Sequence, residues 1–253
     1  MTIAAGFKGA EGIVIGADSQ ETISGFIKLE QRKVHVVLMH QNRALAIAGA
    51  GTSDYIEAAV EKIMGNFPHT DILSEAQEAL EEILIGFFDK HLARWSSFGE
   101  HDRPSVELLI GLSLKHQCGL FHYTGTVLNA VEKKAIGAGI LLANELIREN
   151  YRDHHECKKL AKTAAYILWK VKKNVDTCGG FTDLVLMKEN GMVASIDSST
   201  TEKLEKEFVR MEEESASRLL MEIQSQNLPD FMWHNREGVL AIHDSKKEKK
   251  QKN

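Results

Sequence analysis

The stretch MTIAAGFKGAEGIVIGADS at residues 1–19 decides the fold, together with the pair Lys33-Val34 further along the chain. Two apolar runs in it flank a glycine-bearing turn at residues 9–12, which predicts a tight β-hairpin. Such a hairpin places the start of the chain beside the end of its second strand. We therefore expect Thr2 and Asp18 to lie close together, and a strand that opens at Lys33 brings an amine to the same place.

This trio has a defined chemistry once Met1 is removed, which a small residue such as Thr2 normally permits. Thr2 then carries a hydroxyl nucleophile and a free α-amine, and the pKa of such an amine is ordinarily about 7.7–8.0. A nearby lysine cation lowers that pKa further, so that the neutral amine accepts the hydroxyl proton. Asp18 is expected to pair with Lys33 and hold it charged, because an unpaired buried charge is costly.

Thr2, the GIVIGADS stretch and Lys33-Val34 resemble the corresponding parts of a proteasome β-type subunit. They equally resemble the peptidase of the bacterial two-component ATP-dependent protease, another N-terminal-nucleophile hydrolase. The resemblance covers roughly residues 2–200. It implies stacked rings of identical subunits with the nucleophiles inside, a peptide or unfolded protein as substrate, and an ATPase regulator that no residue of this chain specifies.

Each residue of the trio also has an ordinary structural explanation. Asp-Ser after a strand is a common turn, and a lysine before a strand is commonly a solvated charge. Taken singly, Asp18 and Lys33 are more simply explained in this way. Their order and their distance from the chain start together favour a catalytic site.

The remaining periodicities predict an α+β chain. Strands at 34–39 and 44–48 are expected to join the opening hairpin in one four-stranded sheet, and residues 19–32, which follow the hairpin, are expected as a mixed loop with room for one short strand. Two helices and a loop at 96–105 come next, and strands at 106–114, 119–123 and 130–136 are expected to form a second sheet. Two more helices, strands at 182–187 and 192–196, and a charged helix at 201–226 complete the chain.

That order suggests two sheets packed face to face with helices outside. The resemblance implies the four-layer αββα sandwich, although the pattern alone also allows other α+β folds. We predict one proteasome-like domain at residues 1–200, followed by a C-terminal helical extension with a basic tail at residues 201–253.

A supporting group around the nucleophile is implied by the resemblance and is only partly present. Gly49-Ala50-Gly51 occupies the turn whose backbone amide holds the oxyanion in this family. Ala138 stands where relatives commonly carry Ser. Asp176 and Cys178 are the candidates for an Asp and a Ser shortly before Gly-Gly, with Asp176 one position late. Such losses usually slow a reaction more than they abolish it.

The substrate pocket implied by the resemblance is small and of mixed polarity. Its expected residues are Glu21, His35, Ala48 and Thr52. We predict no metal or other cofactor, because Asp153-His154-His155 with Cys157 lacks a second ligand pair at metal spacing.

Composition excludes several classes of protein. The net charge of −5 argues against a general nucleic-acid binder. An odd number of cysteines without a CxxC pair suits a reducing cytoplasm. We expect a cytoplasmic chain without a membrane anchor, since no run approaches eighteen apolar residues.

Three functions are compatible with these observations. The first is a threonine peptidase that acts inside a ring-shaped homo-oligomer. The second is a catalytically silent ring subunit, suggested by Ala138 and the late Asp176. The third is an N-terminal-nucleophile amidase that acts on small molecules.

Overall fold

The structure is a computed structural model that describes residues 2–23, 27–39, 43–97, 103–225, 233–235 and 238–240. The strands are β1 (Ile3–Gly9), β2 (Gly12–Asp18), β3 (Gln20–Ile23), β4 (Ile27–Glu30), β5 (Val34–Met39), β6 (Arg43–Gly51), β7 (Val106–Leu114), β8 (Gln117–Tyr123), β9 (Leu128–Ala130), β10 (Lys133–Gly137), β11 (Thr182–Lys188), β12 (Val193–Ile196), β13 (Trp233–Asn235) and β14 (Gly238–Leu240). The helices are α1 (Ser53–Asn66), α2 (Leu73–Phe87), the short π-helix η1 (Phe88–Leu92), the 3-10 helix η2 (Ala93–Ser97), α3 (Ile140–Asn150), α4 (Cys157–Asn174) and α5 (Ser198–Ser225).

The predicted opening hairpin is confirmed and lies inside a five-stranded antiparallel sheet. β1 and β2 pair with each other in a register that puts Ala4 opposite Ala17, and the sheet runs in the order β10-β1-β2-β11-β12. This is the first sheet. Thr182, the first residue of β11, lies opposite Asp18, so that three strand ends meet near Thr2.

The second sheet has the order β5-β6-β7-β8-β9. The expectation that the hairpin of β5 and β6 extends the opening hairpin is therefore wrong, because the two hairpins belong to different sheets. Both hairpins have buried apolar faces, and hydrophobic alternation does not say which sheet a strand joins.

The strand predicted at residues 130–136 is also wrong as one element. The Val131 amide donates to the Leu120 carbonyl of β8, while the Lys8 amide of β1 donates to the Glu132 carbonyl, both at 2.8 Å. The chain thus leaves the second sheet as β9 and enters the first as β10. Gly137, which ends β10, reaches the start of β1.

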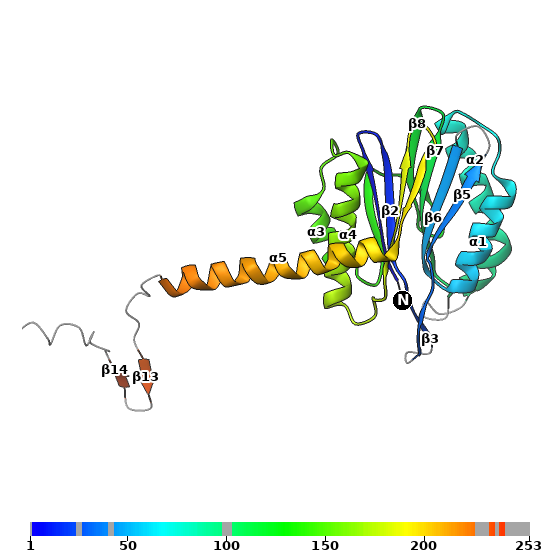
Figure 1. The fold of residues 1–253 in the computed structure, drawn as a ribbon. Helices are drawn as coiled ribbons and strands as arrows, with labels where there is room; N and C mark the ends of the chain where they lie inside the picture. The colour runs from blue at the N-terminus through cyan, green and yellow to red at the C-terminus, as the bar shows by residue number, and fades with distance from the viewer. Residues whose placement is uncertain are drawn as a thin grey trace, which may run out of the picture. The chain divides into compact units, whose positions relative to one another are not determined.

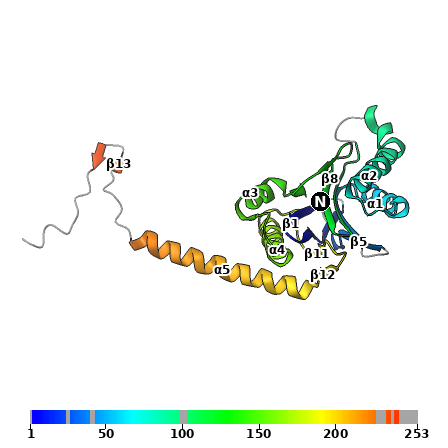
Figure 2. The ribbon, with the colours of Figure 1, turned by 90° about the horizontal axis from the view of Figure 1, so that it is seen from above.

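Two sheets face each other, and helices cover their outer sides (Figures 1 and 2). An apolar cluster between the sheets joins the alanines of β6 to side chains of β2, such as Ile13 and Ile15. A second cluster packs α3 and α4 on the first sheet, and a third packs α1 and α2 on the second sheet. The α+β class is confirmed.

Residues 19–32, expected as a mixed loop with room for one short strand, hold the separate hairpin of β3 and β4. β4 (IKLE) alternates apolar and polar residues, but over four positions only, and β3 (QETI) shows no such alternation, so the pairing of the two strands was missed.

The chain divides into two compact units, residues Met1–Phe208 and Val209–Asn253. The predicted domain boundary at residues 200 and 201 falls inside α5. Within the first unit, the ring of Phe208 packs on those of Tyr166 and Trp169. The basic tail predicted in residues 246–253 lies outside the described residues.

In the part of the chain that the structure describes, no helix combines the length and the apolar character needed to span a membrane.

Candidate active site

Asp18 ends β2 and is fully buried. Its Oδ1 accepts hydrogen bonds from the Ile3 amide at 3.0 Å and from Lys33 Nζ at 2.9 Å. Its Oδ2 accepts one from the Gly179 amide at 3.0 Å. A buried carboxylate needs such donors, and this one ties together the start of β1, the lysine and the loop before β11.

Lys33 directly precedes β5, and its side chain is 11% exposed. Besides the ion pair with Asp18, its Nζ donates to the Gln20 carbonyl at 2.5 Å. The two acceptors fix the direction of the ammonium group. The convergence of Asp18 and Lys33 predicted from the sequence is therefore observed.

Thr2 directly precedes β1, and the backbone of the β10–α3 connection holds it in place. The Ala138 amide donates to the Thr2 carbonyl at 2.7 Å. Gly137 has φ +95°, and a Cβ there would lie 2.0 Å from the Thr2 oxygen. Only glycine permits this close approach, so Gly137 and Ala138 position the candidate nucleophile.

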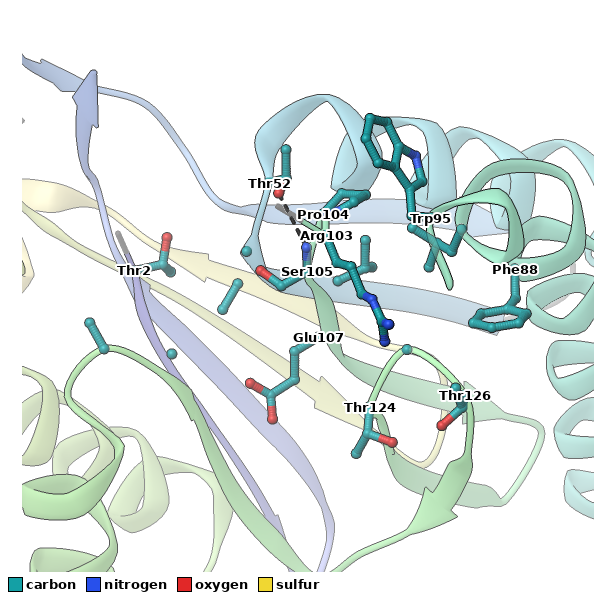
Figure 3. A pocket seen from close by; sticks show the side chains of 17 residues that line it. Thr2, Thr52, Phe88, Trp95, Arg103, Pro104, Ser105, Glu107, Thr124 and Thr126 are labelled. Carbon is teal, nitrogen blue, oxygen red and sulfur yellow. Dashed lines mark hydrogen bonds between the residues drawn. The ribbon is translucent and has the colours of Figure 1, made fainter. Parts of the chain in front are cut away.

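Two cavities meet at Thr2. The smaller, of about 130 Å³, is lined by Thr2, Lys33, Glu21, His35, Gly49 and Gly51, among others. The larger, of about 710 Å³, is lined by Thr2 on one side and by residues of the η1–η2 segment on the other (Figure 3). Thr2 and Lys33 thus line the same small cavity.

The predicted oxyanion segment Gly49-Ala50-Gly51 is not a turn, which corrects the expectation for it. All three residues belong to β6 and pair with β7, Gly51 opposite Val106. Gly51 has φ +130°, and a Cβ there would lie 2.1 Å from the Ser105 carbonyl. The chain turns after Gly51, where the Thr52 amide donates to that carbonyl at 2.8 Å. The segment still reaches the site, because Gly49 and Gly51 line the smaller cavity and Ala50 the larger one.

The predicted pocket residues separate into three places. Glu21 and His35 line the smaller cavity, where Glu21 accepts a hydrogen bond from Ser53 Oγ at 2.7 Å. Thr52 lines the larger cavity. Ala48 is fully buried among the apolar residues between the sheets and lines neither cavity, so the prediction for it is wrong. Alternation along β6 explains this, since Ala46, Ala48 and Ala50 share the face toward the first sheet.

The residues predicted to support the nucleophile lie in different places. Ala138 lines the larger cavity beside Thr2. Asp176 is exposed in the turn after α4, and Cys178 is buried in the apolar cluster under α3 and α4. Burial, with the charge of Asp18, raises the pKa of the Cys178 thiol to about 11. Neither Asp176 nor Cys178 lines either cavity. Cys178 is next to Gly179, whose amide binds Asp18, so it lies close to the buried ion pair without opening to the cavities.

Sequence reasoning missed three residues whose contacts shape the site. Gly137 and Gly179 act through the backbone, and their glycine identity was the available signal. Glu107 lines the larger cavity, and its Oε1 lies 2.7 Å from Nε2 of the buried His122. No motif marks that pair, because β7 and β8 bring it together. Within the described residues there is no group of three or more His, Cys, Asp or Glu suited to hold a metal ion.

No protein-family model matches this chain, and no curated protein matches it. Solved structures of Anbu do. Anbu from Yersinia bercovieri, described as an ancestral β-subunit, superposes with a TM-score of 0.70 at 13% identity and covers 90% of this chain and 100% of its own. A Gly-1 mutant of Anbu from Hyphomicrobium sp. strain MC1 superposes with a TM-score of 0.70 at 14% identity, covering 87% and 99%. The Anbu complex from Pseudomonas aeruginosa, described as a helical assembly, gives a TM-score of 0.69 at 11% identity, covering 90% and 98%.

These structures correct the resemblance inferred from the sequence. The matched structures described above are Anbu proteins, not proteasome β-type subunits or the peptidase of the two-component protease. Thr2, the strand that ends at Asp18, and Lys33 carried the resemblance. They form too short a pattern to assign the chain to either family. At these identities the likeness shows the fold alone: this chain has the fold of Anbu.

Proposed function

We propose that this chain hydrolyses amide bonds through Thr2 once Met1 is removed, in the αββα sandwich of N-terminal-nucleophile hydrolases. One observation carries the proposal: Lys33, whose ammonium is held by Asp18, lines the same small cavity as Thr2. A cation so fixed lowers the pKa of a nearby amine by like-charge repulsion. The α-amine of Thr2 then acts as the base.

The reaction runs in two halves. Thr2 Oγ1 attacks the carbonyl carbon and passes its proton to the α-amine, which later protonates the departing amine as the C–N bond breaks. The resulting ester on Thr2 is attacked by water, whose proton goes to the same amine. The bond between the acyl carbon and Thr2 Oγ1 then breaks, the amine returns the proton to Oγ1, and the acid is released. Backbone amides in the segment Gly49–Gly51, which lines both cavities, are the donors that this scheme assigns to the oxyanion.

Peptides or unfolded proteins are the substrates that we propose. The larger cavity has the volume of sites that hold sizeable ligands, which favours an extended chain over a small amide. Hydrolysis of a small amide without turnover of peptides would instead identify an amidase.

The experiment is intact-mass analysis after incubation with a peptide epoxyketone or β-lactone. We expect a chain that lacks Met1 and gains one inhibitor mass on Thr2, and we expect no adduct on the Thr2→Ala variant. A wild-type chain without an adduct would count against catalysis.

A second candidate is a silent subunit whose role is assembly. Ala138 brings no hydroxyl to Thr2, and Asp176 faces solvent, which favours this alternative. Retention of Met1 in the purified protein would support it. A regulatory ATPase and a cytoplasmic location stay predictions.

Self-association is part of the proposal in both cases. The Pseudomonas aeruginosa Anbu is described as a helical assembly, and a ring is the alternative expected from the sequence. Light scattering coupled to size exclusion tests it: a mass many times that of one chain is expected, and a monomer would contradict it.

A further inference from the structure

The larger cavity beside Thr2 carries chemistry that the proposed reaction does not use. Its volume is about 710 Å³, within the range typical of ligand sites. Phe88, Leu92 and Trp95 of the η1–η2 segment form an apolar wall (Figure 3). Because Thr2 and Gly51 line both cavities, a substrate attacked by Thr2 reaches this one directly.

Hydrogen bonds hold the sides of this cavity in place. Trp95 Nε1 donates to Tyr55 OH at 3.1 Å, which fixes the indole ring. On the facing side, Tyr123 OH donates to the Gly125 carbonyl at 2.6 Å and fixes the turn that follows β8. A cavity with walls fixed before binding loses little entropy when a ligand enters.

Glu107 supplies a negative charge inside this cavity. It lies on β7 opposite Ala50, and its side chain is 30% exposed. Oε1 contacts Nε2 of His122, whose side chain is 7% exposed. Oε1 is thus held by His122, and Oε2 is the oxygen that we assign to a ligand.

Arg103 lines the same cavity and has the opposite charge, but it is exposed. Water and salt screen exposed charges, whereas a partly buried carboxylate with a fixed partner interacts more strongly. Glu107 therefore outweighs Arg103 in selecting a ligand.

We propose that the larger cavity receives the substrate segment on one side of the attacked bond, and that Glu107 there pairs with a positively charged group. This inference rests on the proposed function. The group is an ammonium or guanidinium, supplied either by a lysine or arginine side chain or by the free α-amine of a short peptide. Apolar substrate side chains pack on Trp95 and Phe88.

The test measures binding by the full chain carrying Thr2→Ala, so that no turnover is needed. A blocked neutral hexapeptide is compared with versions that carry one lysine scanned through each position, with one glutamate, or with a free α-amine. Calorimetry gives the affinities. We expect one lysine position to bind roughly tenfold more tightly than the neutral peptide, as for a charge-assisted hydrogen bond, and the glutamate version to bind more weakly.

Three further variants assign the effect. Glu107→Gln, of nearly the same shape, should abolish the preference for lysine, and Glu107→Asp should keep part of it. Glu145→Gln changes an exposed carboxylate of α3 that lines neither cavity and should leave the preference intact. A gain for the free α-amine alone would assign the pairing to that group instead of a side chain.

Equal affinities for neutral and lysine peptides, no peptide binding, or an unchanged preference in Glu107→Gln would overturn the inference. Failure of the proposed function shows separately, as the absence of an inhibitor adduct on wild-type Thr2. A chain that prefers cationic peptides but forms no adduct would keep the binding site and lose the enzyme.

Discussion

The two sides of Thr2 differ in how completely they are built. On one side, Asp18 is fully buried and holds Lys33 and two backbone amides. On the other side, Ala138 contributes a backbone amide and no hydroxyl. The other predicted supporting residues are not part of that side: Asp176 faces solvent, and Cys178 packs in the core next to Gly179, whose amide binds Asp18. The first arrangement cannot be altered without leaving a charge unpaired in the interior, whereas the second can vary at little cost to the fold. The need for a stable fold is therefore enough to explain the arrangement around Asp18. A catalytic role has to be tested by experiments on both sides.

Asp18→Asn should give the largest effect. The substitution removes the counter-charge of Lys33. It also places a side-chain NH2 group opposite one of the N–H donors that Asp18 binds in the wild type. Breaking a buried pair typically costs about 3–5 kcal/mol. Urea denaturation should show that loss in the free energy of unfolding, and the inhibitor adduct on Thr2 should disappear. A variant as stable as the wild type would show that this side is not the structural half of the site.

Gly137→Ala should come next. The added Cβ meets the Thr2 carbonyl at 2.0 Å on a backbone with φ +95°, and such strain costs roughly 1–3 kcal/mol. The adduct on Thr2 should form more slowly. Gly65→Ala is the matched control, since nothing lies within 4 Å of its Cβ, and it should be neutral or stabilising. Equal stability of both variants would contradict the close fit at Thr2.

The buried thiol of Cys178 should lower the free energy of unfolding at alkaline pH. Burial raises its pKa from 9.0 to about 11 in the folded state, so above pH 9 the unfolded chain loses the proton first. The contribution of Cys178 to the free energy of unfolding is fully present below about pH 9, and roughly 2 kcal/mol of it is lost as the pH rises toward 11. Cys118 and Tyr123 act in the same direction, so the measurement is the difference in slope between wild type and Cys178→Ser. Identical slopes would place Cys178 in contact with water.

Ala138→Ser should speed up the reaction of Thr2, because it adds a hydroxyl at a position that has none. The residue lies against Thr2 in the wall of the larger cavity, so a hydroxyl there adds a proton donor and acceptor beside the nucleophile. We expect adduct formation to speed up by roughly tenfold, less than a full acid–base catalyst supplies. Unfolding in urea should be unchanged. A slower reaction would mean that the alanine is needed as it is.

Asp176→Asn should have the smallest effect. The side chain is exposed, and surface substitutions usually change stability by less than about 0.5 kcal/mol. Adduct formation should keep its rate within twofold. A large loss of rate would restore the role predicted for Asp176 from the sequence.

Sequence patterns predicted the local elements better than their assembly. The opening hairpin and the helices followed from hydrophobic alternation and helical periodicity, because those signals arise within one element. Sheet membership did not follow, since β1 and β6 have equally buried faces. The division at Val131 and Glu132 depends on hydrogen bonds to two different sheets, and no local pattern records it.

The same limit applies to the site. Thr2, Asp18 and Lys33 were found because a hairpin and the following strand join them over a short stretch. Glu107 and His122 were missed because only the pairing of β7 with β8 brings them together. Ala48 was misplaced because the pocket was inferred from the family resemblance, without deciding which face of β6 each residue takes.

Thr2 is clamped by Ala138, and it is the point where both cavities meet. If the proposed reaction takes place, any residue attached to the Thr2 nitrogen converts the amine that serves as base into an amide, which cannot accept a proton at neutral pH. Leader residues or a purification tag would then block the reaction, and their removal would have to come before the first turnover.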